Sequence, residues 1–301
     1  MSSLAASLAL FLANAAFPEA HGASSLEPAG EVDVVTAKAD TYARMTVPVR
    51  IGAHGPYHFL IDTGAQNTVV SSAIAARLAL PAGNRATIVG VAGRQEVETV
   101  LIEEFGLGRH SYYNLTAPLL EGANIGADGI VGVDSLQDQR ILIDFKRNLI
   151  AIDQAAYQGG NNGFEIVVRA RRRSGQLIMT QALIDGVRID VVIDTGAENS
   201  IGNRALQRAL SRHGIQGETT LTSVTGQQIV AQIGMGEKLT IGAMDISNVL
   251  LAFTDAPPFT ALDLVKHPAM LLGMRELRLF ERVAIDFPTR KVMFDMAPRP
   301  N

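Results

Sequence analysis

Two apolar runs in this chain each end at an aspartate that is followed by Thr-Gly-Ala. The first run, Phe59–Ile61, leads into Asp62, and the second run, Val191–Ile193, leads into Asp194. Each run is short and rich in β-branched or aromatic residues, which indicates a buried strand rather than one face of a helix. A buried strand that delivers an acid into a turn, twice in one chain, suggests that the two acids meet in the fold.

The elements predicted around the two aspartates repeat in the same order. A strand hairpin precedes each aspartate, and a short amphipathic helix, a Gly-centred hairpin, an apolar run before a glycine and a closing strand pair follow it. In the first half these are the turn at residues 52–55, the helix from Ser71 or Ser72 to Pro81, the hairpin around Gly90 and Gly93, Gly132, and the strands around Asp144. In the second half they are the turn at residues 185–186, the helix from Asn203 to Gly214, the hairpin around Gly226, Gly273, and the strands around Asp286.

This repetition predicts an all-β protein of two duplicated β-barrel lobes, related by a pseudo-twofold axis and each carrying a short helix. Asp194 follows Asp62 by 132 residues and Asp286 follows Asp144 by 142, a drift that loop insertions produce. The expected lobes are residues 31–157 and 164–301, joined by a Gly/Asn-rich linker at residues 158–163.

Composition narrows the class of protein. The 301 residues are 47% hydrophobic and 19% charged, which favours a globular chain over a disordered one. The formal net charge of -4 argues against a nucleic-acid partner, and the basic run at residues 169–173 reads as a solvated strand or linker edge. The absence of cysteine excludes disulfides, thiolate metal sites and a cysteine nucleophile.

The N-terminal residues 1–30 predict an export signal or a disordered arm. Leu4–Phe17 is almost entirely small or apolar, and small residues at Ala13–Ala15 offer a cleavage site, although no Lys or Arg precedes the apolar run. The run is too short for a stable membrane span, so an exported, periplasmic or secreted protein is expected. Whether residues 20–40 form a prosegment stays open.

Two aspartates brought together by a pseudo-twofold axis have a specific chemistry. They cannot both ionise cheaply at short range, so one pKa falls, the other rises, and the pair holds one proton over a wide pH range. The pair then contains a base that can activate water and an acid that can protonate a carbonyl oxygen. Such a pair hydrolyses amides without a metal, a cofactor or a covalent intermediate, and we expect neither metal nor cofactor.

The residues beside each aspartate suit this chemistry. Glycine lets the backbone turn closely and offers an N–H group to the carboxylate, while threonine or serine hydroxyls are available to tie the loops together. The residues expected to support the pair are Thr63, Gly64, Ala65 and Thr68 in the first half and Thr195, Gly196, Ala197 and Ser200 in the second.

On these residues the sequence resembles the retropepsin-like aspartic proteases, the group that contains the retroviral protease, and more distantly pepsin. The shared signature is apolar-apolar-Asp-Thr-Gly-Ala-x-x-Thr/Ser, followed by a glycine-containing hairpin and an apolar-apolar-Gly landmark. The resemblance covers about residues 40–300, with both halves in one chain, and the helix after each loop resembles bacterial members. It implies a monomeric aspartic endopeptidase that cleaves a peptide or protein substrate.

The resemblance also implies roles for individual residues. Asp62 and Asp194 would be the catalytic dyad, Thr63 and Thr195 an interlocking pair beneath it, and the carbonyls of the two loop glycines would contact the substrate main chain. Two flaps would close over the extended substrate. The flap residues expected to bind substrate are Val89, Gly90, Val91, Ala92 and Gly93 in the first half and Ser223, Val224, Thr225 and Gly226 in the second.

Some positions depart from the family pattern. Retroviral enzymes often carry an acid four residues after the catalytic aspartate, whereas this chain has Gln66 in one half and Glu198 in the other. We expect these two residues to contact substrate and Glu198 to pair with Arg275, so that the cleft is asymmetric. Neither flap carries the tyrosine typical of pepsin.

Other interpretations remain beside proteolysis. The same scaffold could be a peptide-binding module with an idle dyad, and a glycosidase would need carboxylates about 5 Å or more apart. His54 and His58 lie in an expected hairpin and read as turn residues rather than metal ligands. Asp144 and Asp286 are also paired acids, but they lie near strand turns and read as structural.

Overall fold

The computed structural model describes residues 44–152, 164–210 and 216–296 in full, and only the backbone of residues 153–154 and of three short N-terminal strands. The proposed linker at residues 158–163 and most of the proposed export signal lie outside the described residues. The three N-terminal strands are β1 (Phe11–Leu12), β2 (Asp33–Thr36) and β3 (Lys38–Ala39).

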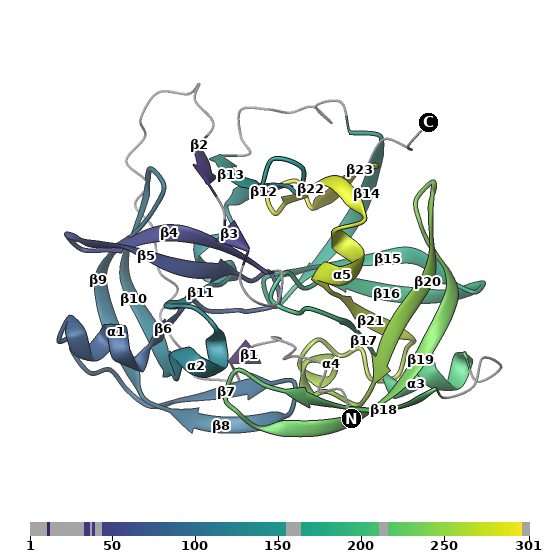
Figure 1. The fold of residues 1–301 in the computed structure, drawn as a ribbon, viewed down its shortest axis with the longest axis horizontal. Helices are drawn as coiled ribbons and strands as arrows, with labels where there is room; N and C mark the ends of the chain where they lie inside the picture. Colours follow the sequence, from purple (N-terminus) through teal and green to yellow (C-terminus); the bar gives the residue numbers. More distant parts are fainter. Residues whose placement is uncertain are drawn as a thin grey trace.

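The first half is a seven-stranded sheet that closes on itself because β4 pairs with both β5 and β9 (Figure 1). The sheet order is β3-β4-β5-β11-β6-β10-β9, and a separate hairpin, β7–β8, extends from it. The elements are β4 (Met45–Ile51), β5 (His54–Ile61), β6 (Val69–Ser71), α1 (Ser72–Arg77), β7 (Ala86–Gly90), β8 (Gly93–Val97), β9 (Thr99–Leu107), β10 (His110–Leu120), α2 (Gly122–Ile125), β11 (Gly129–Val131) and a 3-10 turn, η1 (Val133–Ser135).

The second half repeats this arrangement, and β19 closes its barrel by pairing with β15 as well as with β18 and β20. Its elements are β14 (Ile166–Arg173), β15 (Gln176–Ile184), β16 (Val187–Ile193), β17 (Ser200–Gly202), α3 (Arg204–Ala209), β18 (Gly217–Thr222), β19 (Gln228–Ile241), β20 (Met244–Phe253), α4 (Pro257–Ala261), β21 (Ala269–Leu272) and α5 (Met274–Leu277).

The strand register confirms that the halves are equivalent. In the first hairpin Thr46 pairs with Leu60, and in the second Ile178 pairs with Val192, so both pairs are displaced by the same 132 residues as the aspartates. The strand before each aspartate also has a parallel neighbour: β5 pairs with β11, and β16 with β21. The predicted duplicated all-β fold is therefore correct.

The sheet of the second half continues through β14 into the last strands of both halves, and this extension joins the halves. Antiparallel pairing of Ile141 with Ile285 joins β12 to β22, and the local strand order is β14-β23-β22-β12-β13-β2. Asp144 and Asp286 accept hydrogen bonds at 2.8 Å from the N–H groups of Arg147 and Thr289, which caps the turns and confirms their structural role. The strands are β12 (Gln139–Asp144), β13 (Leu149–Gln154), β22 (Phe280–Asp286) and β23 (Lys291–Met296).

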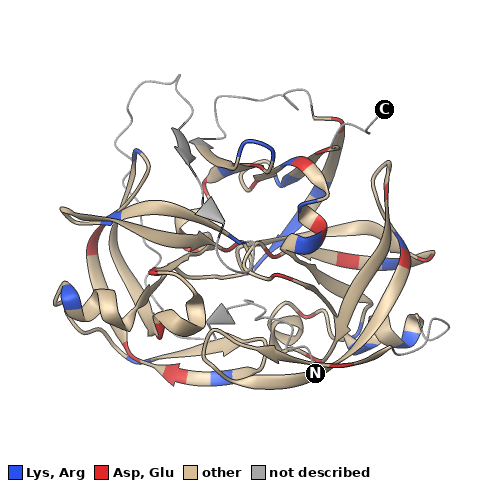
Figure 2. Cartoon of the chain, in the orientation of Figure 1, with Lys and Arg blue, Asp and Glu red and all other residues tan. Residues whose placement is uncertain are grey.

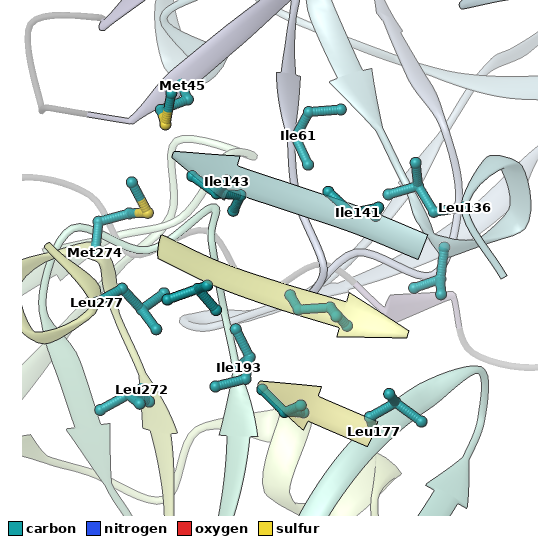
Figure 3. Packing of buried hydrophobic residues seen from close by; sticks show 14 of the residues in the cluster. Met45, Ile61, Leu136, Ile141, Ile143, Leu177, Ile193, Leu272, Met274 and Leu277 are labelled. Carbon is teal, nitrogen blue, oxygen red and sulfur yellow. The ribbon is translucent and has the colours of Figure 1, made fainter. Parts of the chain in front are cut away.

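One hydrophobic cluster runs through both halves and the sheet between them (Figure 3). Ile61 and Ile193, the residues directly before the aspartates, both lie in it, next to Ile141 and Ile143 of β12. Because successive side chains of a strand point to opposite faces, Leu60 and Val192 pack into two other clusters instead. The strands that carry the aspartates are thus buried on both faces, which fixes the direction of each loop.

The predicted helices are present but shorter than expected. Helix α1 is capped by the side chain of Ser71 and ends at Arg77, before Pro81. Helix α3 is capped by Asn203 and ends at Ala209, and residues 211–214 of the expected helix lie outside the described residues. None of the helices in the described part of the chain combines the length and hydrophobicity that a bilayer-spanning helix needs.

The basic run lies along β14, where acids face it. Arg171 pairs with Asp190 and Arg173 with Asp263, both at 3.0 Å, and Arg172 donates to Gln137 of the other half. Figure 2 shows basic and acidic residues interspersed over both lobes in this view. The run therefore contributes contacts within the protein, as expected for a strand edge.

Candidate active site

Each aspartate begins the loop after a strand and is fixed by the neighbouring parallel strand. The N–H group of Asp62 donates to the Val131 carbonyl of β11 at 3.1 Å, and that of Asp194 donates to the Leu272 carbonyl of β21 at 3.0 Å. Gly132 follows Val131, and a side chain there would collide with the backbone of Asn67. The apolar-apolar-Gly landmark is thus a strand that holds the aspartate and a glycine that lets the loop pack against it.

The inner oxygen of each carboxyl is held by backbone N–H groups of its own loop. Oδ1 of Asp62 accepts from Gly64 at 2.8 Å and from the next residue at 3.1 Å. Oδ1 of Asp194 accepts from Gly196 at 3.1 Å and from Ala197 at 3.0 Å. The bonds predicted from the loop glycines are present in both halves, and they orient the two carboxyls in the same way.

The two carboxyls share one buried space. A Cβ atom built on Gly64 would lie 2.7 Å from Oδ1 of Asp194, and one on Gly196 would collide with the carboxyl of Asp62. Both aspartates are fully buried. Their outer oxygens, Oδ2, have no hydrogen-bond partner within the described part of the chain. Two buried acceptor oxygens without a donor are costly, and a shared proton or a water molecule would satisfy them.

Burial makes both aspartates weak acids, and the negative charge of Asp62 weakens Asp194 further. Burial raises the pKa of Asp62 to about 7, against the lowering effect of the loop N–H groups and of the Arg44 guanidinium. The pKa of Asp194 lies well above its usual range because of burial and then because of the negative charge of Asp62. The buried pair therefore retains one proton at pH values at which an isolated aspartate is ionised.

Thr63 and Thr195 lock the two loops across the pseudo-twofold axis. The Thr63 hydroxyl donates to the Ile193 carbonyl at 2.8 Å, and the Thr195 hydroxyl donates to the Ile61 carbonyl at 2.7 Å. Each hydroxyl also accepts from the opposite threonine N–H group, at 3.1 and 3.4 Å. This reciprocal set joins the residues before and after each aspartate to the other half.

Replacing Thr63 with Val is expected to lower the free energy of unfolding by about 1–3 kcal/mol. The change removes the donor to the buried Ile193 carbonyl and the acceptor of the Thr195 N–H group, while the volume stays similar. Urea unfolding followed by circular dichroism measures the loss. Thr63→Ser keeps the hydroxyl and is the matched control. Equal stability of the Val variant and the wild-type protein would contradict the proposed lock.

Thr68 and Ser200 tie each loop to its landmark glycine. Thr68 Oγ1 accepts from the Gly132 N–H group at 3.2 Å, and Ser200 Oγ accepts from the Gly273 N–H group at 3.0 Å. Each hydroxyl then donates to an acid behind the loop, Asp134 in the first half and Glu276 in the second. Glu276 is buried and Asp134 is half-buried, and desolvation raises the pKa of both acids.

The two flaps cross over into opposite halves. Val91, in the turn of β7–β8, is buried with Val192 and Phe259 of the second half. Val224, in the turn of β18–β19, is buried with Leu60 and Ile125 of the first half. The segments predicted as flaps therefore lie on the two clusters that flank the aspartates.

The flaps also contact each other and the chain's own N-terminal strand. Gln227 Nε2 donates to the Arg94 carbonyl at 3.5 Å, which joins one flap to the other. β1 pairs with the outer edge of β7, with Phe11 opposite Val89. The described part of residues 20–40 lies elsewhere: β2 pairs with β13, and β3 with β4.

Gln66 and Glu198, the residues four positions after each aspartate, lie at the ends of the two loops. The Gln66 side chain donates to the Ser174 carbonyl at 3.1 Å, which connects the first loop to the β14–β15 turn. The Glu198 carbonyl accepts from the Arg275 N–H group at 2.9 Å, so these two residues are neighbours through the backbone. Gln176, which sequence reasoning missed, donates its Nε2 to the Gly64 carbonyl that was expected to face substrate.

Two family models match the chain in tandem. A model described as "gag-polyprotein putative aspartyl protease" matches residues 47–138, and a model described as "Aspartyl protease" matches residues 180–275. Together they span more than half of the chain. The chain belongs to the retropepsin-like aspartyl protease family. Each match includes one Asp-Thr-Gly loop, so this retropepsin-like protein contains two copies of the family unit and supports an aspartic peptidase function. No curated protein matches the chain significantly.

Proposed function

We propose that this retropepsin-like protein is an aspartic endopeptidase that hydrolyses peptide bonds of an extended polypeptide, with Asp62 and Asp194 as its dyad. The observation that carries the proposal is the pair of buried Oδ2 atoms, which have no partner within the described residues. They are positioned by matched loops in a space where the pair retains one proton. A glycosidase is disfavoured, because its carboxylates stand about 5 Å or more apart, whereas each carboxyl here abuts the opposite loop's glycine.

In the proposed reaction, the ionised Asp62 takes a proton from a water molecule placed between the two Oδ2 atoms. The water oxygen attacks the scissile carbonyl carbon while Asp194 donates its proton to the carbonyl oxygen, which gives a neutral tetrahedral diol. Proton transfer from Asp62 to the amide nitrogen lets the C–N bond break, and Asp194 regains a proton from the diol. The buried site strengthens each of these transfers because bulk water is excluded.

The flaps are proposed to hold the substrate by its main chain. An extended peptide between the loops and the flaps can pair with a flap strand as an added strand. The Gly64 carbonyl already accepts a bond from Gln176, so main-chain recognition in the first half would share this acceptor with Gln176 or displace it. The expected contacts of Gln66, Glu198 and the flap residues with substrate belong to the same proposal.

Cleavage of a peptide library at several pH values tests the proposal. The expected result is cleavage between residues inside extended peptides that stops when a statine-type mimic of the tetrahedral diol is added. A library that binds but stays intact at every pH would replace this proposal with the peptide-binding module. Size-exclusion chromatography of the active fraction shows whether one chain suffices, as the two loops in a single chain predict.

A further inference from the structure

The first flap carries an extra strand on its outer edge, and this strand comes from the chain's own N-terminal segment. β1 pairs antiparallel with β7, with Phe11 opposite Val89 and Leu12 opposite Ile88. The other edge of β7 is occupied by β8, so the strand order of this small sheet is β1-β7-β8. Figure 1 shows β1 beside β7, between helices α2 and α4 in this view. Both edges of the flap strand β7 are therefore paired.

The stretch of β7 that pairs with β1 packs against the residues that precede the two aspartates. Ile88 is buried in the cluster that contains Leu60, and Val89 is buried in the cluster that contains Val192. Leu60 and Val192 each lie two residues before an aspartate of the pair. β1 is thus paired with the part of the flap that connects the two clusters flanking the aspartates.

The second flap has no such strand in the described part of the chain. β18 is the equivalent strand of the second flap, and it is the last strand of its sheet, paired through β19. The flap of one half is therefore formed without a strand on its outer edge. β1 is an addition to the first half, and it is supplied by residues that precede the repeat.

The composition of the N-terminal segment suits an apolar binding site. No charged residue precedes Glu19, and Leu4–Phe17 is almost entirely small or apolar. Such a segment enters a buried site without the cost of desolvating a charge. A peptide that adds to a sheet edge gains affinity from main-chain hydrogen bonds, which any extended segment can make. The N-terminal segment and an extended substrate therefore need the same edge of β7.

We propose that the N-terminal segment around β1 is an intramolecular ligand of the first flap, which competes with an extended peptide for the outer edge of β7. The inference rests on the proposed function and deepens it, because it assigns a regulator to the same site. While β1 is paired, a peptide can add to the second flap only, and engagement of both flaps requires β1 to leave. The chain with β1 displaced is then the form with the higher affinity for peptide.

Binding of a statine-type peptide to the full chain, measured by calorimetry, tests this competition without requiring hydrolysis. Successive N–H groups of a strand point to opposite sides, so Phe11→Pro combined with Leu12→Pro removes the donor that faces β7. We expect the Kd of this double variant to be lower by about 10-fold or more, because apparent affinity scales with the fraction of competent protein. Ser3→Pro alters the same segment outside β1 and is the matched control, with an expected wild-type Kd.

Amide hydrogen exchange measured by NMR without peptide tests the pairing itself. Of the N–H groups of Ile88 and Val89, one faces β8 and the other faces β1. Exchange of the second is expected to rise about 10-fold or more in the double variant. Unchanged exchange in the folded double variant would overturn the proposal, and so would an unchanged Kd. If the double variant does not fold, one of the two single proline variants should lower the Kd, and failure of both to do so would count against the proposal.

Two further outcomes separate this proposal from its alternatives. A synthetic peptide with the sequence of Leu4–Phe17 should compete with the statine-type peptide for the double variant, and absence of competition would contradict the proposed ligand. A Kd that depends on protein concentration would place the N-terminal segment of a second copy in the site and overturn the intramolecular form. In cleavage assays KM should fall in the double variant while kcat stays unchanged. Tighter binding without cleavage in any variant would refute the proposed function and support β1 as the ligand of the flap.

Discussion

Asp62→Asn and Asp194→Asn are each expected to lower kcat/KM for peptide cleavage by about 10²–10⁴-fold. An asparagine can still accept the N–H bonds that hold the inner oxygen, so each loop should keep its conformation. It cannot share or transfer the proton of the pair. The double variant is expected to be little worse than either single variant, because the two carboxyls act as one unit.

The chain contains a matched control for this experiment. Asp144 and Asp286 are also repeat-related acids, each within an Ile-Asp-Phe strand, but their Oδ1 atoms cap turns in the sheet between the lobes. Asp144→Asn keeps the acceptor for the Arg147 N–H group and is expected to retain wild-type cleavage. Full activity in Asp62→Asn, or an equal loss in Asp144→Asn, would contradict the assignment of the dyad.

The position of the paired aspartates could be predicted from the sequence because the duplication marks it twice. A single Asp-Thr-Gly could be an ordinary turn, but two of them recur with the same hairpin before and the same glycine landmark after. In the structure the strands before the landmark glycines, β11 and β21, accept hydrogen bonds from the backbone N–H groups of Asp62 and Asp194. The order of the landmarks therefore reflects which strands must be adjacent.

The residues that sequence analysis missed act between elements distant in the chain. Gln176 reaches Gly64 across the two halves, over 112 residues, and nothing local to Gln176 indicates that contact. A signal did exist, because alignment of the halves on the aspartates sets Gln176 opposite Arg44. The same alignment does not pair Asp134 with Glu276, the two acids behind the loops. Asp134 is the second residue after its landmark glycine, whereas Glu276 is the third residue after its own.

The second-half segment at residues 254–268 is an insertion whose role could not be predicted from the sequence. From the sequence it could be a lining loop or a simple connection. In the structure it forms α4, and Phe259 is buried with Val89 and Val91 of the opposite flap. The equivalent first-half segment is the shorter helix α2, and its Ile125 lies in the same buried cluster as Val224 of the other flap. The two flaps therefore rest on different supports, and this makes the site asymmetric in a way that the repeat pattern does not encode.

Replacing Gly196 with alanine is expected to lower kcat/KM by at least about 10²-fold, because displacement of reacting groups by about 1 Å has that effect. The new Cβ atom would collide with the carboxyl of Asp62. That carboxyl cannot easily move aside, because its Oδ1 is bonded to Gly64 and Ala65 and the side chain is fully buried. The collision would therefore push the two aspartates apart rather than rotate one of them.

Gly64→Ala tests the same contact from the other half, with its Cβ atom 2.7 Å from Oδ1 of Asp194. Gly122→Ala is the control, since its Cβ atom would lie in ordinary contact, 3.4 Å from Ser71 Cβ. Cleavage kinetics and thermal unfolding should be measured on all three variants, with a crystal structure of Gly196→Ala to locate the carboxyls. We expect the control to keep its activity and the two loop variants to lose theirs while remaining folded. Cleavage at the wild-type rate by either loop variant would show that hydrolysis does not require close contact of the two aspartates. It would therefore contradict a mechanism in which the two carboxyls share a proton.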